Sequence, residues 1–244
     1  MKETAHRREG GMYEGDIPSR AINVVRLGGP AKMYKDIMAD FSRQRRERRE
    51  GHPIVIGLCG FAKVGKDTIA DILVSQLHYE KRAFADRIRE FALAQNAYLP
   101  EVDSRYVDLI NDLGYEGAKR RDPCVRAHLV DIGRASRQTY GVDVLIDATL
   151  PPLGSAAHTK LLMEGKSRLI VVSDCRSVEE ANRIHDYGGV VCRIHRPGCD
   201  AADATEARTI PYVPCDVEFT NDCTVDELPG YILKLLPGVL HCFM

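Results

Sequence analysis

The chain has 244 residues, of which 44% are hydrophobic and 28% charged, with a formal net charge of -1. This predicts one globular domain with room for an appendage. The small net charge gives no strong nucleic-acid signal, no apolar run approaches membrane-spanning length, and the polar N-terminus lacks the apolar core of a signal peptide. We therefore expect a cytoplasmic protein with no membrane partner.

The eight cysteines favour reduced thiols, because none of them forms a Cys-x-x-Cys pair and several sit within apolar runs. A zinc site built on Cys192, His195 and Cys199 is the alternative. Cys192 and His195 stand three apart on a predicted strand, so their side chains point to opposite faces. We expect thiols here and no zinc.

Residues 1–52 differ in character from the rest of the chain. They are polar and rich in glycine up to about Pro30, then weakly amphipathic, and they end in a run of mixed charge from Ser42 to Glu50. We predict a flexible or partly helical extension. Contact with a partner or with nucleic acid is the alternative, although the mixture of Arg and Glu argues against a simple polyanion-binding arm.

A glycine-rich stretch after Pro53 carries the clearest signal. The apolar run Ile54–Cys59 predicts a buried strand, and a helical pattern begins near Lys66. Between them, Gly60, Gly65 and Lys66 fit the pattern G-x-x-x-x-G-K. Glycines let backbone N–H groups approach a polyphosphate, the following helix N-terminus favours negative charge, and the lysine adds a mobile cation. The stretch predicts a phosphate-binding loop, with a purely structural turn as the alternative.

The loop departs from the usual motif at the residue after the lysine. Ser or Thr is usual there, but this chain has Asp67, and Thr68 comes one place later. We expect Asp67 to act through water or a backbone contact and Thr68 to touch a phosphate.

Strands and helices alternate after the loop. Further strands are predicted at Lys81–Phe84, Leu169–Val172, Val190–Ile194 and Val217–Thr220, with helical patterns between them. Such alternation predicts an α/β fold of three layers, in which a five-stranded parallel sheet carries helices on both faces.

Acidic residues follow two of the predicted strands. Asp86 follows the second and Asp174 the third, and ligands bind outside the carboxyl ends of parallel strands. Asp86 is equally compatible with a helix N-cap, whereas Asp174 has the position of a carboxylate on the Mg²⁺ side of a phosphate site. Ser177 and Glu180 predict a capping box at the start of the next helix.

The helix predicted from Pro123 carries several arginines. Arg134 and Arg137 are three apart and therefore share a face. They form either an exposed polar face with carboxylate partners or a pair of guanidinium forks over a transferring phosphoryl group. The sequence leaves both interpretations open.

Six motifs, in this order, resemble the phage-type deoxynucleoside monophosphate kinases, which belong to the wider group of P-loop nucleoside monophosphate kinases. They are Gly65-Lys66-Asp67-Thr68, Phe84-Ala85-Asp86, Leu113-Gly114-Tyr115-Glu116, Ser173-Asp174-Cys175-Arg176, Gly188-Gly189-Val190 leading to Arg196-Pro197, and Thr220-Asn221-Asp222. The resemblance covers about residues 53–236. It fails at Ser177-Val178, where the family has an aromatic residue and Pro.

The resemblance implies a P-loop kinase domain over residues 53–244, with a helical substrate and lid insertion at about 95–165. It implies transfer of the ATP γ-phosphoryl group to a deoxynucleoside 5′-monophosphate, with Mg²⁺, by a homodimer in the cytoplasm (that of a host if the chain is phage-encoded). The ATP-binding residues would be Gly60, Ala62, Lys63, Val64, Gly65, Lys66, Asp67 and Thr68, with Arg196 and Asn221 toward the adenine.

The same resemblance implies three further sets of residues. The acceptor nucleotide would meet Asp86, Arg87, Arg126, Arg134, Arg137 and Asp174. The catalytic set would be Lys66, Arg134, Arg137, Asp174 and Arg176. Mg²⁺ would lie near Asp67 and Asp174, directly or through water. The rival interpretations are another P-loop small-molecule kinase, such as a dephospho-coenzyme A or modified-nucleotide kinase, and a non-catalytic nucleotide-binding or DNA-associated protein.

Overall fold

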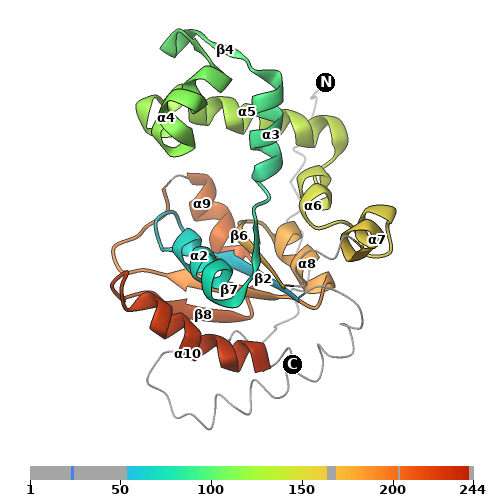
Figure 1. The fold of residues 1–244 in the computed structure, drawn as a ribbon, viewed down its shortest axis with the longest axis vertical. Helices are drawn as coiled ribbons and strands as arrows, with labels where there is room; N and C mark the ends of the chain where they lie inside the picture. The colour runs from blue at the N-terminus through green and yellow to red at the C-terminus, as the bar shows by residue number, and fades with distance from the viewer. Residues whose placement is uncertain (1–22, 25–53, 164–168, 203, 242–244) are drawn as a thin grey trace, which may run out of the picture.

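The computed structural model describes residues 23–24, 54–163, 169–202 and 204–241. A parallel sheet forms the middle of the described chain (Figure 1). Its strands are β1 (Asn23–Val24), β2 (Ile54–Cys59), β3 (Glu80–Arg82), β6 (Leu169–Cys175), β7 (Val190–His195) and β8 (Val217–Thr220). They lie in the order β1-β8-β7-β2-β6-β3, so β2 is flanked by β6 and β7.

All five predicted strands are confirmed, and the sheet gains a sixth that the sequence analysis missed. β1 comes from the stretch that we expected to be an extension, and it pairs with β8 through Asn23 and Val24. Two residues give too short a pattern to be recognised as a strand. The remainder of residues 1–52, including the charge run, lies outside the described residues.

The strand β3 ends earlier than predicted, at Arg82 instead of Phe84. The three N–H groups that follow are bonded to carboxylates and not to a neighbouring strand. Ala83 donates to Asp86, while Phe84 and Ala85 donate to Asp174. Side-chain acceptors therefore replace the strand ladder at this point.

The helices alternate with the strands as expected. They are α2 (Lys66–Leu77), α3 (Asp86–Gln95), α4 (Tyr106–Arg121), α5 (Pro123–Tyr140), α6 (Val144–Thr149), α7 (Ala156–Met163), α8 (Val178–Asp186), α9 (Ala204–Thr209) and α10 (Leu228–His241). A short hairpin of β4 (Tyr98–Leu99) and β5 (Ser104–Arg105) and two 3₁₀ turns, η1 (Pro100–Val102) and η2 (Ile210–Tyr212), complete the described elements. None of the described helices is long and apolar enough to cross a membrane.

Three groups of buried side chains hold these layers together. The first joins β2 and β7 to α2 and α10 through residues such as Ile56, Ile69 and Ile232. The second packs α6 and α8 against the sheet through residues such as Ile146 and Ile184. Helices therefore cover both faces of the sheet, as predicted.

The third group of buried side chains belongs to the helical region beside the carboxyl edge of the sheet (Figure 1). It joins α3, α4 and α5 through residues such as Ala92, Tyr106 and Leu129. These helices thus bury their apolar faces against one another and not against the sheet.

The chain leaves this helical region after α6, and side chains of the sheet and of α8 hold its backbone there by hydrogen bonds. Arg82 donates to the carbonyl of Thr149 at 2.8 Å, Arg183 to that of Leu150 at 2.5 Å, and the Tyr187 hydroxyl to that of Pro151 at 2.6 Å. These three consecutive carbonyls fix the backbone between α6 and α7 to the sheet.

The predicted capping box at the start of α8 is confirmed. The Ser177 hydroxyl accepts the N–H of Glu180 at 3.3 Å, and the Glu180 carboxylate accepts the N–H of Ser177 at 3.1 Å and that of Arg176 at 2.6 Å. Burial raises the pKa of Glu180 to about 7 and the charge of Asp174 adds to this, although the backbone N–H bonds oppose it. The folded chain therefore keeps a proton on this carboxyl at pH values where the unfolded chain has lost it.

We expect this carboxyl to make the folded state less stable as the pH rises from its ordinary pKa of 4.5 to about 7. In that range the folded state binds more protons than the unfolded state, so the free energy of unfolding falls, by on the order of 3 kcal/mol. Glu180→Gln keeps an acceptor oxygen and should flatten the dependence of Tm on pH. The exposed Glu179→Gln is the control, and equal slopes for the two variants would contradict the assignment.

Candidate functional site

The glycine-rich loop lies between β2 and α2, at the carboxyl end of the middle strands. Gly60 has φ 139° and Gly65 has φ 100°, which L side chains rarely adopt. A Cβ on Gly60 would lie 2.4 Å from the carbonyl oxygen of Ile194 on β7. The two glycines therefore allow a path close to β7 that other residues could not follow.

Lys66 is the cation that this loop surrounds. Its side chain is only 7% exposed, and its ammonium donates to the carbonyls of Gly60 at 2.8 Å and Phe61 at 2.6 Å. Burial lowers the pKa of Lys66, and the nearby charge of Arg176 lowers it further. An ammonium has three donors, so one remains for a ligand, and a buried cation in a glycine-rich loop suits a phosphate.

Asn221 supports the loop from the buried side. Its amide nitrogen donates to the carbonyl of Val64 at 2.9 Å, its backbone N–H donates to His195, and its side chain is fully buried. A Cβ on Gly65 would lie 2.5 Å from the same amide nitrogen. We expected Asn221 near an adenine, but the structure places its side chain under the loop.

Glu206 is a site residue that the sequence analysis missed. It lies on α9 and is 5% exposed. Its carboxylate accepts the loop N–H of Ala62 at 3.2 Å and the N–H of Ala202 at 3.0 Å, and it pairs with Arg176 at 3.3 Å. We expected only a loop or short helix here, and a glutamate in a polar stretch gives no signal of such contacts.

Asp174 ends β6 beside the loop, as predicted. One oxygen accepts the N–H of Phe84 at 2.7 Å and the other that of Ala85 at 3.0 Å. Burial raises the pKa of Asp174, and these two bonds lower it, with the net shift upward. The carboxylate therefore fixes the start of α3 to the end of β6, which adds a positioning role to the one expected.

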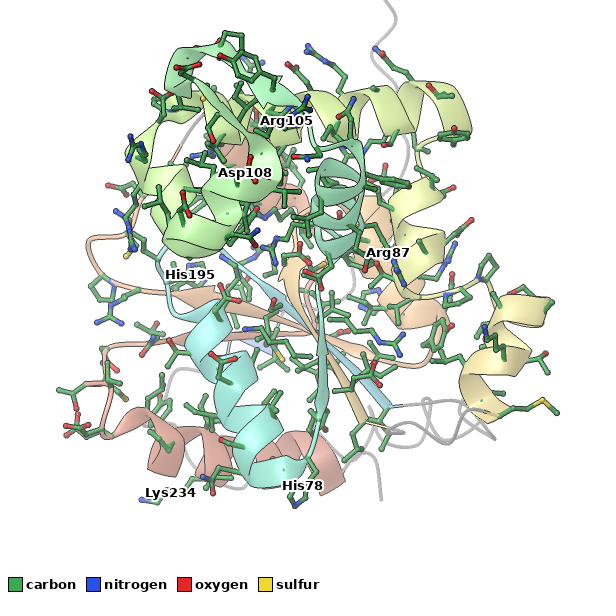
Figure 2. The ribbon with its side chains drawn as sticks, turned by 45° about the horizontal axis from the view of Figure 1, so that its top comes forward. His78, Arg87, Arg105, Asp108, His195 and Lys234 are labelled. Atoms are coloured by element: carbon green, nitrogen blue, oxygen red, sulfur yellow. The ribbon has the colours of Figure 1, made fainter. Side chains whose placement is uncertain are left out.

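Asp86 and Arg87 point in different directions from the start of α3. The N-cap of α3 is Ala85, so Asp86 is the first helical residue; it accepts the N–H of Ala83 and pairs with Arg89 at 2.8 Å. Arg87 pairs with Glu90 and donates to a carbonyl of α6, that of Ala148, at 3.3 Å. Figure 2 shows Arg87 on the side of α3 that faces α6, so it lies apart from the loop.

The arginines that the sequence singled out on α5 have different surroundings. Arg134 is exposed and pairs with Asp131 on the same helix, as expected for a solvated face. Arg137 is also exposed, but its charge lowers the pKa of Glu180, so it lies on the side of α8 and the end of β6. Arg126 is exposed near the start of the helix.

Asp67 points away from the loop that it follows. Its carboxylate pairs with Lys81 at 3.1 Å, and the same ammonium pairs with Asp71 at 2.9 Å. In the part of the chain that the structure describes, no group of three or more His, Cys, Asp or Glu residues could hold a metal ion. The Asp67 carboxylate is thus occupied by Lys81 in this structure.

The other predicted nucleotide contacts vary in exposure. Val64 belongs to the buried core, so only its backbone faces a ligand, while Lys63 is exposed with φ 65°. Thr68 is half-buried in the first turn of α2, and Arg196 is exposed just after β7.

The sheet order, the loop after the central strand β2 and the buried Lys66 together define a P-loop kinase fold. No family model matches the chain. In sequence, it is 25% identical over 196 residues to a protein of Acanthamoeba polyphaga mimivirus named "Putative deoxynucleotide monophosphate kinase", a match that covers 74% of this chain and 95% of that protein. The resemblance that the motifs indicated is thus confirmed.

Solved structures with a similar chain path include two small-molecule kinases. Dephospho-CoA kinase from Campylobacter jejuni is 13% identical, with a TM-score of 0.40 over 78% of this chain and 98% of that one. Shikimate kinase from Aquifex aeolicus is 12% identical, with a TM-score of 0.35 over 76% of this chain and 97% of that one.

Replacing Asn221 should weaken both the fold and the loop. Asn221→Ala leaves the buried carbonyl of Val64 without its donor, which costs about 1–3 kcal/mol. We expect a matching loss in urea unfolding and weaker binding of ATP. Asn182→Ala, on the exposed side of α8, is the matched control. An unchanged free energy of unfolding in Asn221→Ala would show that the bond to Val64 contributes nothing.

Replacing Glu206 should change the charge at the loop with little change in shape. Glu206→Gln keeps an acceptor for the N–H groups but removes a negative charge next to Lys66 and Arg176. We expect ATP to bind about fivefold more tightly, which corresponds to about 1 kcal/mol of relieved repulsion. Displacement of a fluorescent ATP analogue measures this, with Glu179→Gln as the control. Weaker binding would mean that the charge of Glu206 helps to form the nucleotide site.

Proposed function

We propose that this chain transfers the γ-phosphoryl group of ATP to a deoxynucleoside 5′-monophosphate. The observation that carries the proposal is the loop at the end of β2, where the buried Lys66 lies among backbone groups with Arg176 close by. The name of the mimiviral relative supports the acceptor class, because that protein matches most of this chain.

The loop residues supply what phosphoryl transfer requires. The reaction needs alignment and neutralisation of charge more than covalent chemistry by the protein. Lys66 would hold the outer phosphates of ATP, and Arg176 would leave Glu206 in part to share their charge. The acceptor phosphate is already ionised, so no strong general base is needed.

Mg²⁺ would enter with the nucleotide. The cation would neutralise charge between the outer phosphates of ATP. Asp174 is the strand-end carboxylate available near it, and because both its oxygens accept backbone N–H bonds we expect contact through water. Asp67, the other carboxylate expected near the metal, is paired with Lys81.

The decisive experiment measures ATP consumption with each of the four common deoxynucleoside monophosphates in turn, and then with ribonucleoside monophosphates and dephospho-coenzyme A. We expect at least one deoxynucleotide to be phosphorylated, and we expect Lys66→Ala to lower the rate by about 10²–10³. Consumption only with dephospho-coenzyme A or only with ribonucleotides would replace the proposed acceptor. Normal turnover by Lys66→Ala would remove the loop from the mechanism.

A further inference from the structure

Two arginines near the start of α3 face opposite ways. Arg87 and Arg89 are two residues apart, and two helical residues are separated by about 200° around the axis. Arg87 reaches a carbonyl of α6. Arg89 instead lies against Tyr115 of α4. The motif resemblance pointed to Arg87 for the acceptor. Arg89, however, is the arginine whose guanidinium is oriented by a carboxylate and an aromatic ring.

Arg89 is held firmly but remains accessible. Its Nη1 pairs with an oxygen of Asp86 at 2.8 Å, and its guanidinium carbon lies 4.4 Å from the centre of the Tyr115 ring. The side chain is nevertheless 40% exposed. A guanidinium stacked on an aromatic ring has its plane fixed and its N–H edges directed outward.

Tyr115 reaches this position because of a break in α4. Gly114 has φ 65° and ψ 165°, which are not helical, and it divides α4 into two parts just before Tyr115. The ammonium of Lys119 lies 4.6 Å from the centre of the same ring. Two cations therefore share one aromatic side chain, and each also has a carboxylate partner, Glu116 for Lys119 and Asp86 for Arg89.

A short chain of contacts links Arg89 to the end of β6. The second oxygen of Asp86 accepts the N–H of Ala83, and the next two N–H groups, of Phe84 and Ala85, bind Asp174. Burial lowers the pKa of Arg89, but the Tyr115 side chain and the charges of Asp86 and Asp174 raise it, with the net shift upward. Arg89 thus lies next to the strand-end acid, on the side of α3 away from α6.

The guanidinium of Arg89 also has N–H donors that Asp86 does not use. It carries five N–H donors, and one of them, at Nη1, binds the carboxylate of Asp86. Its buried Nε has no hydrogen-bond partner among the described residues. Phosphate oxygens, like carboxylate oxygens, match this planar fork because they can accept two parallel N–H bonds.

We propose that Arg89 binds the phosphate of the acceptor nucleotide, with Asp86 and Tyr115 as positioning residues. This inference rests on the proposed function. It places the acceptor phosphate between α3 and the carboxyl end of β6, facing the loop that holds ATP. The competing explanation is that Arg89 only joins α3 to α4.

The test compares Arg89→Met with Arg87→Met, which remove the same charge from the same helix. For Arg89→Met we expect KM for the acceptor to rise at least about tenfold, with KM for ATP within about twofold. For Arg87→Met we expect both constants to stay within about twofold. Arg89→Lys keeps the charge without the fork and should fall between Arg89→Met and the wild type. Equal acceptor KM values for the two methionine variants would overturn the proposal.

A purely structural role predicts a different pattern. If Arg89 only joins two helices, Arg89→Met lowers Tm and reduces activity while the acceptor KM of the folded fraction stays unchanged. If Arg89→Met does not fold, Tyr115→Leu retains the arginine and removes the ring that holds it. We then expect the acceptor KM to rise about threefold, and an unchanged value would reject the proposal.

Direct binding separates this inference from the proposed reaction. Calorimetry with ADP present measures the affinity of each variant for deoxynucleoside monophosphates, whether or not transfer occurs. Transfer by the wild type with unchanged binding in Arg89→Met rejects only the role of Arg89. If the wild type transfers nothing, the proposed reaction fails, and a loss of binding in Arg89→Met alone would still support the acceptor site. If the wild type binds no deoxynucleotide, both proposals fail.

Discussion

The carboxylate of Asp174 connects the sheet to the helical region beside it. It is the last polar side chain of β6, and it binds the two N–H groups that precede α3. These bonds end β3, set the direction in which α3 leaves the sheet, and bring Asp86 and Arg89 to the same edge as the loop. Because such charge-assisted bonds are about twice as strong as neutral ones, one side chain can fix this arrangement.

The sheet and the loop could be predicted from sequence because both depend on local patterns. Apolar runs such as Ile54–Cys59 mark parallel strands buried on both faces, and the glycine spacing before Lys66 specifies a backbone path. The capping box at Ser177 is equally local. The six motifs also indicated the relationship to deoxynucleotide monophosphate kinases, which the mimiviral protein bears out in sequence.

Contacts between distant segments could not be predicted in this way. Glu206 meets Ala62 across 144 residues, and no period or motif marks it. Asn221 was expected toward the adenine, and only the structure shows that its buried amide donates to the carbonyl of Val64 in the loop. Arg87 was named for the acceptor because it follows the Phe-Ala-Asp motif directly, and its bond to the carbonyl of Ala148 on α6 appears only in the structure. The homodimer and the cytoplasmic location stay predictions.

The three carbonyls of Thr149, Leu150 and Pro151 have a consequence for movement. The chain enters the helical region at the turn that is bonded to Asp174. It leaves this region where Arg82, Arg183 and Tyr187 donate hydrogen bonds to these carbonyls. Both crossings are thus anchored to the sheet. Any bending of the helical region relative to the sheet would therefore have to occur beyond these bonds, within α3 to α6, because the bonds fix the chain at both ends.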